Sequence, residues 1–511
     1  MGVFPSCMED EYDNSKVVKK GPLATLIFGN RFKSGQTLYE YLIEFLLVFV
    51  SAKNEDLKEG KMQFHDITID SSFKYWVEPR MALRRFIFYD KAKKKGSIKE
   101  DSFAYHEMIN QLINKMEVKD EEQAKEYVED IQDLFHGYAV VVRNRFWGAQ
   151  ALLPICPEFV LCGVDPTEIK RKKKVKWEEE PETVDTKFEF TKHNFLARGG
   201  EVYYLHLLQG IDGNKGKKEE LEVLLDDLVN RQCKKISKLA EYIQNMWEEQ
   251  YSMDKKALSQ KLTMSYIPDT GYKECGGYSV DELISFLSCN LQPITRVEVL
   301  AKGVMLQIMR MMSYRVADYL GKEKQVWIVD MKGETTDTIK KIAHKSFQNI
   351  EADFITAINK MANEVGVNED ERMKKVNEAR SDSLDIFKNK GKELQCIIPM
   401  SGPFERFTLS EDIIRFLVLS LIKPGDKMTL KMFLDKLYHN YQIVIGPEEY
   451  RKSLEKTELD SSLASSFSDN VVAFQNFLQS TGFLKELSDA TSIVVNPYEP
   501  ISDPAKTAAM Q

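Results

Sequence analysis

Long stretches with helical periodicity constrain this 511-residue chain more than any other feature of its sequence. Apolar residues between Leu225 and Met246 recur three, four or seven positions apart, the spacing of a helix face that packs against another helix. Residues 293–320 and 336–365 carry similar patterns, and the first of these begins with a proline, which is typical of a first helical turn. The sequence therefore predicts a mainly α protein with minor β, an α+β fold.

A short run rich in β-branched and aromatic residues, 325–333, separates two of these helical stretches. We expect it to form a short strand. The helical stretch before it carries Met305, Met309 and Met312 on one face. Such a stripe is typical of adaptable core packing and less often of a partner-binding surface.

The chain length predicts about three domains. We expect an N-terminal α+β domain, a central long-helix domain and a C-terminal winged-helix-like domain, with a β/loop connector and two flexible tails. Gly199 and Gly200, in the connector, are expected to form a turn before a buried segment. By residue number the segments are tail 1–20, N-terminal domain 21–165, connector 166–216, central domain 217–393, winged-helix-like domain 394–501 and tail 502–511.

Two sequence pairs have the spacing of a capping box and predict helix starts, Thr37 with Glu40 and Ser279 with Glu282. The first pair precedes the most apolar run of the chain, residues 38–50. A spanning helix needs about 20 apolar residues, and this run is shorter and contains two glutamates, so we expect a buried core helix and no membrane contact.

The C-terminal third has the order of a winged helix. Helices are expected over 413–422, 429–438 and 470–480, followed by a hairpin of strands 483–487 and 492–495. A recognition helix needs basic and amide groups to meet phosphates and base edges. The last of these helices has no lysine or arginine, which favours a protein contact or a structural role over DNA binding.

Composition and motifs argue against several classes of protein. The net charge of −8 and the pI near 5.7 argue against a generally basic nucleic-acid coat. The seven cysteines form no Cys-x-x-Cys pair, which favours a reducing cytoplasm over a disulfide framework or a zinc site. His-Glu-x-x-His, Gly-x-Ser-x-Gly and kinase signatures are missing from the sequence. We therefore expect a cytoplasmic protein with no metal and no cofactor.

Residues 210–218 resemble a phosphate loop but depart from its spacing. Five residues, and not four, lie between Gly210 and Gly216, and Lys218 stands where a serine or threonine would bind magnesium. We therefore expect a basic turn before a long helix, and no ATPase.

Asp330 and Lys332, at the end of the expected strand, are the candidate catalytic residues. An acid-x-lysine strand with a second carboxylate upstream would bind a divalent metal in a restriction-type nuclease. The nearby upstream acids lie in or at the end of a helix and not on a strand. A buried strand whose last residues cap the next helix is therefore favoured over a nuclease site, which stays an alternative.

Local basic patches leave a DNA-binding module open as a further alternative. The patch at 170–176 precedes Glu178–Glu180, so a solvated loop is favoured there over a phosphate track. The nucleic-acid-binding candidates are Lys93, Lys94, Lys95, Arg143, Arg145, Lys172, Lys173 and Lys174.

Three stretches, 193–209, 293–320 and 326–346, resemble an accessory subunit from bacterial phage-defence and restriction operons. They contain His-Asn-Phe-Leu-Ala-Arg-Gly-Gly-Glu, a long helical arm, and Ile-Val-Asp-Met-Lys-Gly followed by Ile-Ala-His-Lys-Ser-Phe. The family they resemble is the DptG-like component of DNA-phosphorothioation-dependent restriction. The resemblance implies a subunit without a nucleotide motif that works beside an ATPase and a helicase or nuclease.

The helical seam, the methionine stripe and the missing catalytic signatures together favour a non-enzymatic scaffold or adaptor. It would belong to a cytoplasmic multiprotein assembly that defends DNA. Its expected partners are other protein subunits of the same operon, through which it would reach DNA.

Overall fold

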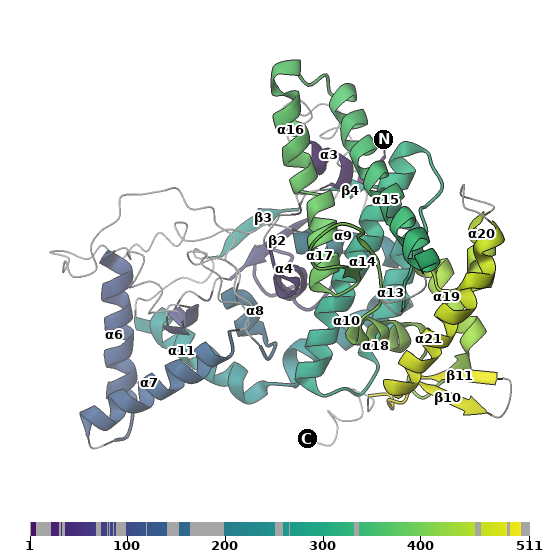
Figure 1. The fold of residues 1–511 in the computed structure, drawn as a ribbon. Helices are drawn as coiled ribbons and strands as arrows, with labels where there is room; N and C mark the ends of the chain where they lie inside the picture. The colour runs from purple at the N-terminus through teal and green to yellow at the C-terminus, as the bar shows by residue number, and fades with distance from the viewer. Residues whose placement is uncertain are drawn as a thin grey trace.

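The computed structural model describes residues 2–6, 22–29, 32, 36–67, 73–78, 80, 82–84, 86–87, 99–118, 120–139, 153–163, 199–250, 259–264, 266–331, 337–454, 461–487 and 491–501. Helices dominate these residues, and the strands are short (Figure 1). This confirms the predicted mainly α fold with minor β.

One long helix, α14 (Pro293–Leu320), forms the centre of the molecule and has the predicted bounds. Around it pack α4 (Leu38–Val50), α13 (Tyr272–Leu287), α15 (Asp337–Glu364) and α18 (Glu411–Leu421). The methionine stripe of α14 is fully buried, which confirms its interpretation as core packing. The predicted capping box of α4 is also confirmed.

The helix α9 (Gly199–Ile211) lies where the sequence predicted a β/loop connector, so that prediction is wrong for these residues. α9 is buried and packs against α4 and α13. A Cβ at Gly200 would lie 2.5 Å from the Tyr41 carbonyl oxygen, and one at Gly210 would lie 2.3 Å from the Gly276 carbonyl oxygen. The glycines that suggested a turn therefore let helix backbones approach closely.

The helix predicted from residue 217 to 247 is divided. α10 (Lys215–Asp226) is followed by the π-helical turn η3 (Asp227–Arg231) and then by α11 (Lys234–Gln250). Leu225 belongs to the main core and Met246 to a second apolar cluster. The π turn thus divides the apolar pattern, so that apolar residues of α10 pack in the main core and those of α11 pack in the second cluster.

The second apolar cluster is enclosed by α11 with α6 (Lys99–Lys115), α7 (Glu121–Gly137) and α8 (Pro157–Gly163). In Figure 1 α6, α7 and α11 lie to the left of α14, and α8 lies between them and α4. We call α6, α7, α8 and α11 the helical lobe.

The strands β2 (Lys74–Val77) and β3 (Gln260–Thr263) pair antiparallel.

Residues 2–6 correct the predicted flexible tail over the part that the structure describes, while residues 7–20 lie outside the described residues. β1 (Val3–Phe4) pairs antiparallel with β4 (Ile267–Pro268), and α3 (Leu23–Phe28) follows further along the chain. Val3 and Phe4 are buried, and the Phe4 ring lies 6.3 Å from that of Phe73. Apolar contact and strand pairing therefore hold Val3 and Phe4 in place, although the polar composition of the tail predicted no structure there.

A small group of strands gathers beside α15. β5 (Trp327–Ile328) pairs in parallel with β9 (Ile443–Val444), and Val329 bridges Phe407 in parallel. Phe407 belongs to β7 (Arg406–Phe407), which pairs antiparallel with β6 (Ile397–Ile398). The strand expected within 325–333 is therefore confirmed. Its neighbours come from more than 70 positions further along the chain.

The C-terminal elements confirm the three predicted helices and the hairpin. A three-stranded antiparallel sheet has the order β10-β11-β8. The elements after α18 are β8 (Lys427–Thr429), α19 (Leu430–Tyr441), β9, α20 (Pro447–Leu454), η4 (Ser461–Ser466), α21 (Phe467–Ser480), β10 (Leu484–Leu487) and β11 (Thr491–Val495).

The main core crosses the boundaries of the predicted segments, since it runs from Phe4 to Val494. It includes residues of α16 (Glu369–Ser381) and α17 (Leu384–Glu393), the helices that follow α15. Among the described residues, no helix combines the length and the apolar composition needed to cross a membrane.

Candidate functional site

Asp330 is fully buried directly after β5. Its Oδ2 accepts a hydrogen bond from Arg406 Nε at 2.8 Å, and its backbone N–H donates to the Phe407 carbonyl at 2.9 Å. A metal site needs several ligands around the ion, and here the nearest partner on the adjacent strand is a guanidinium. The described residues hold no group of three or more His, Cys, Asp or Glu that could bind a metal. The carboxylate of Asp330 therefore forms a structural ion pair.

Asn470 of α21 ties the same corner together. Its side-chain oxygen accepts from the Met331 N–H at 2.9 Å, and its side-chain nitrogen donates to the carbonyls of Val329 and Ile445, each at 2.9 Å. One buried amide thus satisfies backbone groups at the ends of β5 and β9. This corner joins the strands to the C-terminal helices.

The other sequence candidates lie outside the residues that the structure describes. They are Lys332, Lys93, Lys94, Lys95, Arg143, Arg145, Lys172, Lys173 and Lys174. Of the candidates, the structure therefore places Asp330 alone.

The structure brings together a serine and a histidine that the sequence did not link. Ser279 Oγ of α13 lies 2.7 Å from His206 Nε2 of α9, a distance suited to a nucleophile and its base. Both residues are fully buried, and Arg310 Nη2 also donates to Ser279 Oγ at 2.8 Å. Burial, with the charge of Arg310 as a second cause, lowers the pKa of His206 to about 3. Because a substrate cannot reach this oxygen, we interpret the pair as structural.

Glu282, one turn further along α13, is the centre of this network. It accepts two hydrogen bonds from Arg310, at 2.8 and 2.9 Å, and one from Gln307 at 2.7 Å. Asn440 and Tyr441 of α19 donate to it at 3.0 and 2.6 Å. The Arg310 guanidinium lies 4.1 Å from the Tyr441 ring centroid. This buried bidentate pair joins three helices that are far apart in the sequence.

The network corrects the predicted capping box at Ser279 and Glu282. α13 begins seven residues earlier, at Tyr272, after Gly271 with a left-handed φ of 84°. Ser279 and Glu282 therefore lie inside the helix on its buried face. Ser279 and Glu282 have the spacing of a capping box, but they bond to residues of other helices and cap no helix.

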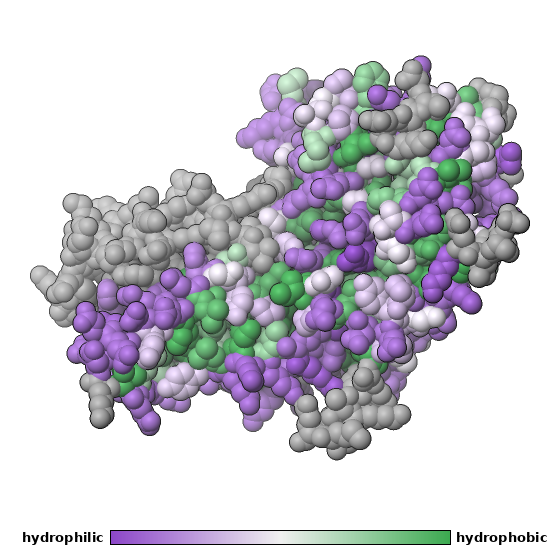
Figure 2. Space-filling view, turned by 60° about the horizontal axis from the view of Figure 1, so that its bottom comes forward, coloured by the Kyte–Doolittle hydropathy of each residue, from purple (hydrophilic) through white to green (hydrophobic). Residues whose placement is uncertain are grey.

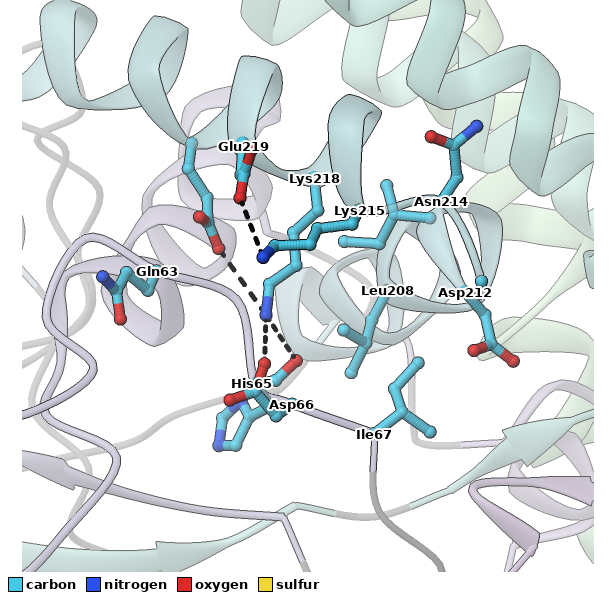
Figure 3. Close-up of a pocket in the computed structure, with 13 residues that line it drawn as sticks. Gln63, His65, Asp66, Ile67, Leu208, Asp212, Asn214, Lys215, Lys218 and Glu219 are labelled. Carbon is cyan, nitrogen blue, oxygen red and sulfur yellow. Dashed lines mark hydrogen bonds and ion pairs between the residues drawn. The ribbon is translucent and has the colours of Figure 1, made fainter.

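The stretch that resembles a phosphate loop lines an open cleft of about 550 Å³ (Figure 3). Gly213, with a φ of 73°, makes the turn between α9 and α10. The side chain of Asn214 caps α10 by accepting from the Lys217 N–H at 3.1 Å. One of the helix-start N–H groups that could meet a phosphate is therefore already bonded.

Charges in the cleft neutralise one another. The ammonium of Lys218 lies 2.5 Å from Asp66 and 3.9 Å from Glu222, and Lys215 lies 3.6 Å from Glu219 (Figure 3). Burial raises the pKa of Glu222, although its hydrogen bond with the Phe64 N–H opposes this effect. Asp212 adds a further carboxylate to the lining. The cleft has more carboxylates than ammonium groups in its lining and is therefore a poor site for a phosphate.

The back of the cleft is fixed by buried polar contacts. His65 Nδ1 lies 2.8 Å from the Tyr204 hydroxyl, and burial, followed by the charge of Lys53, lowers the pKa of His65 to about 3. Lys53 donates to the carbonyls of Val48 and Ser51 at 2.6 and 2.7 Å, which caps the end of α4. Burial lowers the pKa of Lys53 as well. These groups hold the loop against α4 and α9.

Comparisons with known protein families, with curated proteins and with solved structures find no match to this chain. Inference about its function therefore depends on the residues themselves. Among the described residues, Ser279 with His206, Glu282 with Arg310 and Asp330 with Arg406 are paired with one another inside the core.

The Glu282–Arg310 pair is the feature that sequence reasoning missed. A signal was available, because Arg310 interrupts a run of apolar residues and methionines in α14. A single charge on a helix that is otherwise apolar there predicts a buried partner. The identity of the partner of Arg310 could not be read from spacing, since Glu282 belongs to another helix.

Proposed function

We propose that this chain is a non-enzymatic scaffold or adaptor subunit of a cytoplasmic multiprotein complex that defends DNA against viruses. Its partners would be an ATPase, a helicase or a nuclease encoded in the same operon, in keeping with the resemblance to DptG-like subunits. The observation that carries the proposal is the exposed face of helix α21 in the C-terminal module, which lacks basic residues and is suited to contact a protein.

The order of the C-terminal elements supports a winged-helix-like domain over residues 394–501. α18, β8, α19 and α21 are followed by the β10–β11 hairpin, and β8 pairs with β11. In such domains the last helix before the hairpin is the one that enters a DNA groove. α21 has that position, while α20 and η4 form an insertion before it.

The exposed face of α21 is unsuited to DNA. It presents Asp469, Val472, Asn476 and Gln479, and the helix contains no lysine or arginine. Neutralising phosphates with lysine and arginine supplies most of the sequence-independent affinity for DNA. One apolar side chain and two amides beside a carboxylate can instead meet a protein surface through apolar contact and hydrogen bonds. DNA would therefore be reached through partners.

The buried networks support a structural role over catalysis. Asp330 is paired with Arg406, and Ser279 with His206 lies beneath a buried ion pair. A nuclease that uses Asp330 and Lys332 would need the carboxylate free for a metal ion. The pairing with Arg406 argues against this alternative.

Co-expression with the products of neighbouring genes tests the proposal. We expect a stable complex in size-exclusion chromatography with light scattering, and we expect Val472→Glu on α21 to weaken it. Met373→Glu is the matched control, because Met373 lies on α16 and is 78% exposed. A strictly monomeric protein that co-purifies with no neighbour-encoded protein would refute the proposal.

A further inference from the structure

The loop between β6 and β7 carries apolar side chains on the surface. Met400 and Phe404 are 61% and 54% exposed, and Pro403 is exposed as well. The centroid of the Phe404 ring lies 5.1 Å from that of the His344 ring, which belongs to α15. These three apolar residues, which we call the loop tip, therefore lie beside the N-terminal half of α15.

Exposed apolar side chains by themselves do not single out the loop tip. Figure 2 shows apolar side chains among hydrophilic ones at several places on the face that it draws. Such side chains are normal on protein surfaces. The backbone of Phe404 is what distinguishes it, because its φ is 71°. Of the five residues other than glycine with a left-handed φ that the structure describes, Phe404 alone is both apolar and exposed.

Neighbouring contacts hold this unusual backbone in place. A left-handed φ at a bulky residue costs about 1–3 kcal/mol. The carbonyl of Glu405 lies 2.9 Å from His344 Nδ1, and its carboxylate forms ion pairs with Lys388, at 2.5 Å, and with Lys392, both of α17. The loop tip is therefore fixed in the position that exposes Phe404, and a preformed contact surface loses less conformational entropy on binding.

Lysines of α15 flank the loop tip. Lys340 and Lys341 precede His344 by four and three positions, so they lie one turn away on the same side of the helix. Lys345 follows His344 directly, and the four residues lie within a sector of about 140° around the helix axis. Lys341 and Lys345 are exposed. Within the part of the chain that the structure describes, none of the three lysines forms an ion pair.

The carboxylates of α15 leave this positive charge in excess. Glu351 lies 2.6 Å from Lys388, and buried Asp353 lies 2.6 Å from Lys322. Asp337, where α15 begins, adds one carboxylate against three lysines. The exposed positions of α15 between 338 and 359 carry lysine, glutamine, alanine, isoleucine and threonine. This surface is therefore locally basic, although the net charge of the chain is −8.

We infer that the loop tip and the lysines of α15 together bind an acidic segment of a partner protein. An apolar side chain of that segment would cover the loop tip, and its aspartate or glutamate side chains would meet the lysines. Phenylalanine and methionine are enriched at protein interfaces, and complementary charge selects the partner. This inference rests on the proposed adaptor function and names the chemistry of one partner.

Single-stranded nucleic acid is the other anionic class that lysines and an aromatic ring can bind. Such sites usually combine a basic groove that follows the backbone with aromatic rings that stack on bases. Here the net charge of −8 disfavours a long polyanion, whereas a short acidic segment meets only the local positive charge. The acidic segment is therefore the favoured occupant.

A designed helical peptide of about 18 residues tests the inference. It carries leucine along one side and glutamate elsewhere, and a matched peptide carries glutamine in place of glutamate. With the full chain and fluorescence anisotropy at low salt, we expect the glutamate peptide to bind at least about tenfold more tightly. The difference should shrink as salt rises above about 0.15 M, because screening weakens exposed charge pairs. A labelled oligothymidine of about 16 nucleotides should not bind this surface.

The Phe404→Asn variant separates binding from folding. Asparagine removes the ring and tolerates a left-handed backbone better than phenylalanine does. We expect the variant to bind the glutamate peptide at least about tenfold more weakly, as for an interface anchor. Its midpoint in urea unfolding should be unchanged or higher. A residue with only a packing role would not combine weaker binding with undiminished stability.

Charge reversal tests the lysines. Lys341→Glu with Lys345→Glu should weaken binding of the glutamate peptide at least about tenfold. The matched control is Lys234→Glu with Lys238→Glu, because these lysines of α11 are also exposed and four positions apart. The control should bind like the unmodified chain, and circular dichroism checks that each variant folds.

Several outcomes would overturn the inference. Equal binding of the glutamate and glutamine peptides would remove the charge argument. Unchanged binding by the folded Phe404→Asn variant and by the folded Lys341 and Lys345 variant would remove the site. Oligothymidine binding that Phe404→Asn abolishes would assign the surface to nucleic acid. A dimer of the full chain that reversal of Lys341 and Lys345 separates would assign it to a second copy.

The outcomes also separate this inference from the proposed function. A neighbour-encoded partner that folded Phe404→Asn retains and Val472→Glu loses would refute docking at the loop tip and leave the adaptor function standing. Specific glutamate-peptide binding by a chain that co-purifies with no neighbour-encoded protein would support the surface and refute the adaptor function.

Discussion

Removal of Glu282 should destabilise the protein strongly. The Glu282→Ala variant leaves the fully buried guanidinium of Arg310 without its carboxylate. Burial by itself would lower the pKa of Arg310, but Glu282 and then Tyr441 raise it overall, so the guanidinium stays charged in the fold. Removing one partner of a buried ion pair costs about 3–5 kcal/mol. The loss should lie toward the upper end, because Gln307 and Asn440 also lose an acceptor.

A double replacement separates the charge effect from lost packing. Glu282→Met with Arg310→Met removes both charges and keeps much of the side-chain volume. Because apolar replacement of a buried pair is often close to neutral, we expect the double variant to be more stable than either single one. The coupling between the two positions should be about 2 kcal/mol or more in favour of the intact pair.

Urea unfolding followed by circular dichroism and tryptophan fluorescence measures these effects, with the midpoint as the primary quantity. The control is Glu411→Ala, which removes the surface contact with Arg415 and should cost no more than about 1 kcal/mol. A Glu282→Ala variant within about 1 kcal/mol of the unmodified protein would refute the reasoning. A double variant no more stable than the single ones would also refute it.

Four further predictions concern buried residues of the same core. Gly210→Ala should lower the melting temperature because its Cβ would meet the α13 backbone, whereas exposed Gly216→Ala in α10 should be neutral or slightly stabilising in the same calorimetric scan. The pKa of His206 is lowered to about 3, so the unfolded state takes up a proton at a higher pH than the fold does. The free energy of unfolding should therefore fall as pH drops from about 6.5 toward 3, by up to about 1.4 kcal/mol per pH unit. His206→Gln should reduce this slope in urea titrations across pH. Asp330→Ala should destabilise the protein by about 3–5 kcal/mol, since the buried guanidinium of Arg406 loses this carboxylate. The unmodified protein should not cleave DNA with magnesium or manganese, and cleavage that disappears in Asp330→Ala would replace the adaptor proposal with a nuclease.

Local sequence signals located most of the helices. The proline before α14 and the Thr37–Glu40 capping box act within a single helical turn, so their effect can be read from neighbouring residues. The hairpin at the end of the chain and the strand β5 were predicted for the same reason. Each of these signals depends on residues a few positions apart.

Glycine and polar residues misled the prediction where their partners were distant. Gly199 and Gly200 suggested a turn, yet they start a buried helix that packs against α4. Ser279 and Glu282 suggested a helix start, yet they bond to other helices from the middle of α13. A glycine serves a turn or a close helix contact equally well, and a serine or glutamate either caps a helix or bonds to another helix. The choice depends on residues far away in the sequence, so local spacing does not show it.

The sequence by itself determined the helical class, the place of α14 and the lack of lysine and arginine in α21, because spacing and charge are local properties. The tertiary structure decided what the reactive side chains do. Glu282 meets Arg310 across 28 positions, and Asp330 meets Arg406 across 76. These pairings depend on how the helices pack, so the free energy of the whole core selects them.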